Sequence, residues 1–124
     1  MTTRVRYIVH DIDAAIVFYT GSLGFKVDAH PGPGFAAISR GDLHLLLNRP
    51  GAGGAGQAMQ DGQLPAPGGW NRIQIEVDEL EAMVEQLRAE GNRFRNEIVI
   101  GNGGRQILLE DPSGNPIELF EPPK

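Results

Sequence analysis

Arginine and carboxylate side chains recur at alternating positions in short apolar segments of this chain. Arg4 and Arg6 belong to one such segment, Arg72 and Gln74 belong to a second, and Glu118 is the carboxylate of a third. Guanidinium groups bind carboxylates and phosphates through paired hydrogen bonds. A carboxylate among apolar neighbours can instead act as a general base or a metal ligand. The chain therefore carries groups for two kinds of chemistry, anion binding and carboxylate-based catalysis.

The segment that carries Glu118 predicts a tight turn followed by a strand. Pro112 and Gly114 suit the turn, and the apolar run that follows reaches Phe120. Alternation with period two places Glu118 and Phe120 on the face opposite Ile117. We expect Glu118 to point into whatever the sheet encloses, the alternative being a carboxylate at a solvated sheet edge.

The elements around these residues form a pattern that occurs twice. In each half a strand leads into a helix of about 12 residues, with Asp11 or Asp78 near its start and Gly24 or Gly91 at its end. Three short strands follow each helix. The predicted strands are 4–9, 25–29, 35–39 and 43–47 in the first half, and 72–77, 93–98, 105–110 and 116–120 in the second.

Residues 50–69 separate the two halves and are dominated by Gly, Ala, Pro and Gln without an apolar period. Connections of about 20 residues without regular structure are uncommon inside a compact domain. We interpret this segment as a linker. The alternative is a flap over a ligand cavity, with Met59 and Leu64 as its apolar contacts.

Composition limits the classes of protein to which the chain can belong. Its 124 residues are one domain's worth, and the absence of cysteine excludes disulfides and thiolate metal sites. A net charge of -5 disfavours nucleic-acid binding, which favours a basic face. No run reaches the length of a membrane span, so we expect a cytoplasmic protein without a nucleic-acid or membrane partner.

Three features together resemble the vicinal oxygen chelate superfamily, which includes glyoxalase I, bleomycin resistance proteins and extradiol dioxygenases. They are the duplicated unit, Phe18-Tyr19 ahead of Leu23-Gly24-Phe25, and the ending Asp-Pro-Ser-Gly-Asn-Pro-Ile-Glu-Leu at 111–119. The resemblance implies an α+β fold of two tandem βαβββ modules, about 3–49 and 70–121, in one domain spanning 1–124. The modules would form a curved, mostly antiparallel sheet cup with helices on the convex side. It also implies a symmetric homodimer.

In metal-dependent members of the superfamily, the first and last strands of each module supply the metal ligands. Carried over to this sequence, the ligand positions fall on Arg4, Arg72, Glu118 and either Leu45 or Leu46. Arginine stays protonated and offers no lone pair to a cation, so we expect no metal and no other cofactor. The alternative is a relocated metal site that uses one of the three histidines, of which His44 is nearest to an expected position.

The predicted function is metal-free binding of a small anionic or aromatic molecule in a sheet-lined cavity. The alternative is a metal-dependent lyase, isomerase or dioxygenase that uses Glu118, or a metal-free enzyme with Glu118 as general base. The arginines could also serve only to neutralise Glu76 and Glu118, and Trp70 could anchor the linker instead of stacking on a ligand. The predicted ligand-binding residues are Arg4, Arg6, His44, Trp70, Arg72, Gln74, Glu118 and Phe120.

Overall fold

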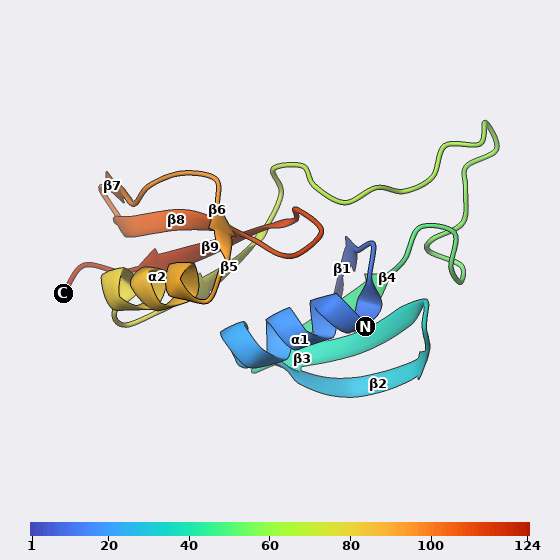
Figure 1. The fold of residues 1–124 in the computed structure, drawn as a ribbon, viewed down its shortest axis with the longest axis horizontal. Helices are drawn as coiled ribbons and strands as arrows, with labels where there is room; N and C mark the ends of the chain where they lie inside the picture. Colours follow the sequence, from blue (N-terminus) through green and yellow to red (C-terminus); the bar gives the residue numbers. More distant parts are fainter. The chain divides into compact units, whose positions relative to one another are not determined.

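The computed structural model describes all residues from 1 to 124 and divides the chain into two compact units, Met1–Gly68 (unit 1) and Gly69–Lys124 (unit 2). Both units contain one helix and one sheet (Figure 1). Unit 1 consists of β1 (Val5–Ile8), α1 (Ile12–Leu23), β2 (Lys26–Gly32), β3 (Phe35–Arg40) and β4 (Leu43–Asn48). Unit 2 consists of β5 (Ile73–Glu76), α2 (Leu80–Ala89), β6 (Arg93–Phe94), β7 (Val99–Gly101), β8 (Gly104–Glu110) and β9 (Pro116–Glu121).

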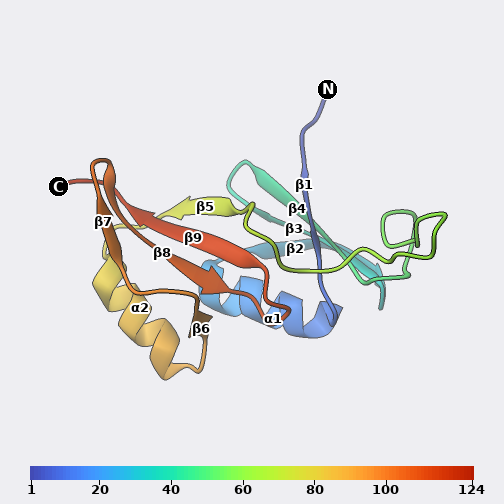
Figure 2. The same cartoon turned by 90° about the horizontal axis from the view of Figure 1, so that it is seen from above.

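The two sheets share one strand order. In unit 1 the order is β1-β4-β3-β2, and in unit 2 it is β5-β9-β8-β6, with β7 paired to β8. The first strand of each unit pairs in parallel with its last strand, and every other pair is antiparallel. The helix of each unit lies along one face of its own sheet (Figure 2). The predicted α+β class and mostly antiparallel βαβββ units are therefore confirmed.

In unit 1 the helix begins and ends where its sequence signals predict. The Asp11 carboxylate accepts a hydrogen bond from the backbone N–H of Ala14 at 3.1 Å, and Gly24 ends the helix in the left-handed region at φ 75°. Helix α1 packs on β2, β3 and β4, where Leu45 and Leu47 are fully buried. His44 is exposed, so the alternation of β4 places the odd-numbered leucines in the core and His44 on the opposite face.

Helix α2 obtains its N-terminal cap from a distant strand and not from Asp78, the acidic residue near its start. The helix begins at Leu80, and the side chain of the N-cap residue Glu79 makes no capping bond. The Glu121 carboxylate, at the end of β9, accepts the Leu80 N–H at 2.8 Å instead. Neither α1 nor α2 is long and apolar enough to cross a membrane.

The strand predicted over 93–98 is wrong. Strand β6 ends at Phe94, and the unpredicted strand β7 follows after a bend. Polar side chains explain the break: the Asn96 amide oxygen accepts the backbone N–H of Leu108 at 3.0 Å, and Arg95 turns its guanidinium to three acceptors described below. The Arg95 backbone N–H still donates to the Leu108 carbonyl at 2.9 Å, but the return bond from Leu108 goes to the Asn96 side chain instead of the backbone, and the strand ends there.

The segment 50–69 contains no helix or strand, yet its first part is folded into a hydrogen-bonded loop. Ala52 N–H donates to the Arg49 carbonyl at 3.1 Å, and Gly56 N–H donates to the Ala52 carbonyl at 3.0 Å. Gly56 is buried inside this loop. Met59 and Leu64 are exposed, and the flap interpretation stays a prediction.

We predict that Gly56→Ala destabilises unit 1 by about 1–3 kcal/mol, the range for forcing atoms into a packed site. An added Cβ would lie 2.2 Å from the Arg49 carbonyl oxygen and 2.4 Å from that of Ala52. Urea unfolding followed by circular dichroism measures the change. Gly54→Ala is the matched control, because nothing lies within 4 Å of its Cβ. Equal unfolding free energies for the two variants would contradict the loop geometry.

We also predict a pH dependence that originates in the cap of α2. The Leu80 N–H and then Arg105 lower the pKa of Glu121 from its ordinary value of 4.5. The ionised cap therefore stabilises the fold above pH 4.5, and this contribution is lost as the pH falls through the lowered pKa.

Urea unfolding at a series of pH values from about 7 to about 3 tests this cap. Glu121→Gln should lose less stability over that range than the unsubstituted protein. Glu97→Gln, at a side chain 85% exposed, should retain the original pH dependence. A Glu121→Gln curve parallel to that of the unsubstituted protein would refute the assignment.

Candidate functional site

The sheet of unit 2 has one face packed for the core and one face that carries polar groups, called here the open face of unit 2. On the core face, Ile117 and Leu119 are fully buried. The alternating residues Gln74, Glu118 and Phe120 point the other way. The parallel pairing of β5 with β9 sets Gln74 directly opposite Glu118. The predicted alternation of this strand pair is therefore confirmed.

Three predicted site residues meet at the Glu118 carboxylate. Arg72 donates from Nε and Nη2 to Glu118 Oε1, at 3.0 and 2.8 Å. Gln74 Nε2 donates to Glu118 Oε2 at 2.6 Å. The Glu118 side chain is 11% exposed and that of Arg72 is 28% exposed. Both oxygens of a largely buried carboxylate are thus held by donors from the neighbouring strand and the residue that precedes it.

This arrangement limits what Glu118 can do. Three of the four lone-pair positions of the carboxylate are occupied, two on Oε1 and one on Oε2. A metal ion could therefore approach only at Oε2 beside Gln74, where the adjacent Arg72 guanidinium would repel a cation. Arg72 can still donate further hydrogen bonds. Its Nη1 donates to the Trp70 carbonyl at 3.2 Å, and one N–H on each Nη has no partner. The partly exposed guanidinium edge can therefore still reach a ligand.

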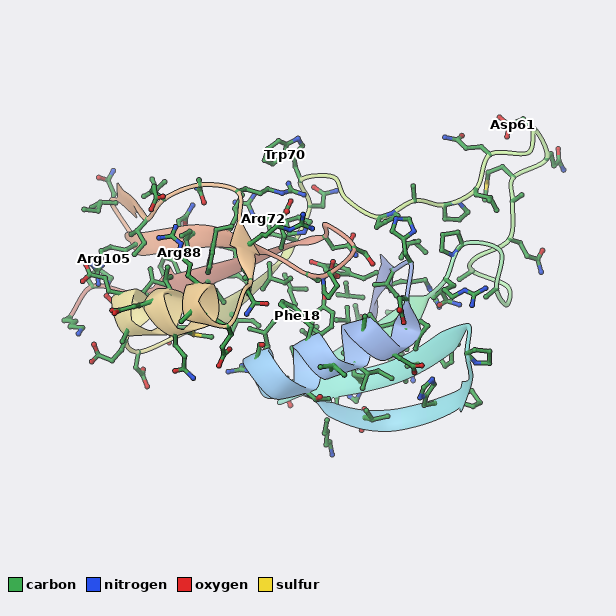
Figure 3. All side chains as sticks on the ribbon, viewed as in Figure 1. Phe18, Asp61, Trp70, Arg72, Arg88 and Arg105 are labelled. Carbon is green, nitrogen blue, oxygen red and sulfur yellow. The ribbon has the colours of Figure 1, made fainter.

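Trp70 lies beside this cluster at the same end of unit 2, as Figure 3 shows. Its indole is 70% exposed, so it is not a buried anchor for the linker. The Arg95 guanidinium carbon lies 4.8 Å from the indole ring centre, a distance typical of a cation–π contact. Gly69, Trp70, Arg95 and Glu110 line a shallow depression of about 420 Å³.

Arg95 was not among the predicted site residues, yet it organises this end of the unit. Its Nε donates to Glu110 Oε2 at 3.0 Å, Nη1 to the Gly69 carbonyl at 2.6 Å and Nη2 to the Gly114 carbonyl at 2.9 Å. The side chain is 17% exposed. The assignment of Arg95 to a continuous strand concealed this role. Its partners Gly69, Glu110 and Gly114 are distant along the chain, so no local sequence pattern indicates these bonds.

A second ionic cluster lies at the opposite end of unit 2, where Figure 3 labels Arg105. Arg105 Nη2 donates to Glu121 Oε1 at 2.6 Å and Nη1 to Glu81 Oε1 at 2.6 Å. The bonds to Glu121 and then Glu81 raise the pKa of Arg105 above its ordinary value. Because Glu121 also caps α2, we interpret this cluster as structural.

The sheet face of unit 1 opposite α1 is called the open face of unit 1, and it carries the remaining predicted residues. Arg6 Nη1 donates to the buried Asn48 amide oxygen. Asn48 Nδ2 lies 3.4 Å from the Ala52 carbonyl and so links β1 to the loop after β4. His44 is exposed on β4, and Arg4 is exposed just before β1.

The strand register identifies the equivalent positions of the two units. Arg6 is paired with Leu46 as Gln74 is paired with Glu118. Leu46, rather than Leu45, therefore occupies the position of Glu118. Arg4 lies two residues before Arg6, as Arg72 lies two residues before Gln74, so Arg4 is equivalent to Arg72.

The donors at these positions do not fit the divalent metal that the superfamily resemblance implies. Two guanidinium groups and one leucine offer no lone pair, and the remaining carboxylate already accepts three hydrogen bonds. No group of three or more His, Asp or Glu side chains gathers elsewhere in a form that could hold a metal. His44, the proposed centre of a relocated site, is not part of such a group, and we derive no chemical step through a metal.

Comparisons with known proteins place the fold among solved structures. Lactoylglutathione lyase from Agrobacterium tumefaciens is 20% identical, with a TM-score of 0.74 over 98% of this chain and 92% of that one. TnmS3, an antibiotic binding protein from Streptomyces sp. CB03234, is 23% identical, with a TM-score of 0.70 over 99% and 98%. A glyoxalase/bleomycin resistance protein/dioxygenase from Nocardioides is 24% identical, with a TM-score of 0.71 over 98% and 83%.

At these identities the structural likeness establishes the fold alone. No curated protein matches the sequence significantly. The family assignment comes from the sequence itself, because the family model for the Glyoxalase/Bleomycin resistance protein/Dioxygenase superfamily matches residues 3–119. That match covers nearly the whole chain and confirms the resemblance read from the duplicated unit and the 111–119 ending. The chain belongs to the glyoxalase/bleomycin resistance protein/dioxygenase superfamily.

Proposed function

We propose that this protein binds a small planar molecule without the aid of a metal and does not catalyse a metal-dependent reaction. The observation that carries the proposal is the double engagement of Glu118. It is the only carboxylate at the four positions expected of metal ligands, and Arg72 and Gln74 hold its two oxygens. A catalytic metal usually needs about three protein ligands, and this set offers one carboxylate that already accepts three hydrogen bonds.

The surroundings of Trp70 support a binding role. Its carbonyl accepts a bond from Arg72, and Arg95 lies against one face of its ring. These contacts hold an exposed indole in place, and a rigid aromatic surface binds planar groups with little loss of conformational entropy. The depression beside the ring, with partly exposed polar groups at Arg95 and Glu110, would orient such a ligand.

An antibiotic binding protein is among the proteins with this fold, so the architecture accommodates binding without our having to assume catalysis. The lyase of the same fold keeps the enzymatic alternative in view. For that alternative, Glu118 would have to act through the one lone pair that its three donors leave on Oε2. The binding function places no such demand on Glu118, and we therefore favour it.

The first test separates metal-free binding from metal-dependent chemistry. A small-molecule screen by thermal shift, run with EDTA and with added Zn²⁺, Ni²⁺ or Mn²⁺, should yield compounds whose stabilisation is the same in all conditions. Elemental analysis of protein purified without added metal should find no stoichiometric metal. The proposal would be overturned if the protein contained about one metal ion per chain, and if that ion were lost in Glu118→Ala and retained in Glu97→Ala.

The second test asks how far Arg72 serves structure rather than binding. Arg72→Met should lower the free energy of unfolding by about 1–3 kcal/mol, because it removes two of the three hydrogen bonds to a largely buried carboxylate. The double replacement Arg72→Met with Glu118→Leu should recover much of that loss. Urea unfolding of both single variants and the double variant gives the coupling energy.

Arg88→Met is the matched control for this cycle. Arg88 bonds Glu97 at 3.0 Å, but their side chains are 43% and 85% exposed, so its loss should cost less than about 1 kcal/mol. If Arg72→Met is no more destabilising than Arg88→Met, the Arg72–Glu118 pair is not the structural element described here.

A further inference from the structure

The two units carry arginine at the same register position, but only one of the two arginines has a carboxylate to neutralise it. Arg72 bonds Glu118 through two N–H groups. The equivalent of Glu118 in unit 1 is Leu46, which faces Arg6 across the β1–β4 pair. Arg4, the equivalent of Arg72, therefore has an aliphatic side chain where Arg72 has its counter-ion.

Arg4 also lacks any other partner. It is exposed, and it makes no hydrogen bond or ion pair within the chain. Its neighbour on the same face, Arg6, makes one side-chain bond, to the neutral amide of Asn48. An arginine that folding does not use keeps all five of its N–H donors for a ligand.

Strands β1, β3 and β4 add no acidic residue to the open face of unit 1 beside these two arginines. Alternation along the three strands beside them gives this face only neutral residues and histidine. These residues are Ile8 on β1, Phe35, Ala37 and Ser39 on β3, and His44, Leu46 and Asn48 on β4. Asp42, in the turn between β3 and β4, is exposed and makes no ion pair with either arginine. The two arginines therefore form a cationic patch with no carboxylate bonded to it, in a chain whose net charge is -5. Such a patch attracts anions.

We propose that Arg4, with Arg6 beside it, binds an anionic group, a carboxylate or a phosphate, on the open face of unit 1, and that Arg72 does not. The proposal rests on the metal-free binding proposed above and adds a preference for negative charge that is carried by unit 1. A planar guanidinium matches both anions through paired hydrogen bonds. Leu46 contributes because it is uncharged. An acidic residue at this position would neutralise Arg4, as Glu118 neutralises Arg72.

Three probes that share one ring system test the charge requirement. 1-Naphthoate carries a carboxylate, 1-naphthyl phosphate carries a phosphate, and 1-naphthamide is neutral and close in shape to the first. Isothermal titration calorimetry on EDTA-treated full-length protein should show that at least one anion binds more tightly than the amide. Its affinity should fall as salt is added, and the better anion identifies the group that the site prefers.

Arg4→Met should weaken binding of the preferred anion by at least about tenfold, as expected for the loss of a hydrogen bond to a charged group. Binding of 1-naphthamide should stay the same. Since Arg4 has no partner in the fold, its replacement should leave the unfolding temperature unchanged. Arg49→Met removes another exposed arginine of unit 1 and is the matched control, and neither it nor Arg72→Met should discriminate between the anion and the amide.

A replacement at Leu46 tests the reason for the difference between the units. Leu46→Glu gives unit 1 the carboxylate that unit 2 has, and it should abolish the preference for the anion over the amide. Leu46→Gln has nearly the same size without the charge and should retain that preference. If Leu46→Glu and Leu46→Gln change the preference for the anion by the same amount, Arg4 does not recognise the charge on the ligand.

The remaining outcomes separate this proposal from the one on which it rests. Equal affinity for the anions and the amide, unaffected by Arg4→Met, would overturn the assignment of Arg4 and leave metal-free binding intact. Failure of all three probes to bind the metal-free protein would overturn the assignment as well. If compounds from the thermal-shift screen also required a metal, metal-free binding itself would fail.

Discussion

The parallel pairing of the first strand with the last strand in each unit is the constraint from which the candidate site follows. It brings residues 46 positions apart, Arg72 and Glu118, into contact, and it places Gln74 directly opposite the same carboxylate. Because parallel strands cannot be joined by a tight hairpin, a helix and further strands must lie between them. The βαβββ order is therefore what makes a side-chain cluster across the first and last strands available at all.

The superfamily's metal positions sit on this strand pair, and in this chain the pair carries different chemistry. In unit 2 the carboxylate is retained but neutralised by an arginine, whereas in unit 1 the arginine is retained and the carboxylate is replaced by Leu46. The two halves thus resemble each other in backbone and register while differing in the charge of their open faces. This difference in charge is the observation from which metal-free binding by hydrogen bonds and stacking is proposed.

Much of this could be predicted from the sequence, because strong local signals agreed with the tertiary structure. The alternation around Glu118, the cap at Asp11 and the stop at Gly24 each depend on near neighbours, and the structure confirms all three. The duplicated order of elements allowed Arg72 and Glu118 to be assigned to adjacent strands. The register, which the sequence left open between Leu45 and Leu46, was decided by burial of Leu45 against the helix.

The features that the sequence did not reveal depend on partners distant along the chain. Nothing near Asp78 indicates that Glu121, from the last strand, caps α2. Nothing near Arg95 indicates that its guanidinium meets the Gly69 and Gly114 carbonyls, Glu110 and the Trp70 ring. In both places a long-range side-chain bond overrides a local pattern, and such a bond is visible only after the fold has brought the partners together.

The central claim is that Arg72 and Gln74 keep Glu118 from acting as a metal ligand. The most direct measurement is a titration of isotopically labelled protein with Mn²⁺, followed through the side-chain amide resonances of Gln74, whose Nε2 lies 2.6 Å from the carboxylate. A paramagnetic ion on Glu118 would broaden those resonances first. We expect them to persist at stoichiometric Mn²⁺, with no more broadening than the amide of an exposed residue such as Gln57. Selective loss of the Gln74 signals at stoichiometric metal would contradict the account.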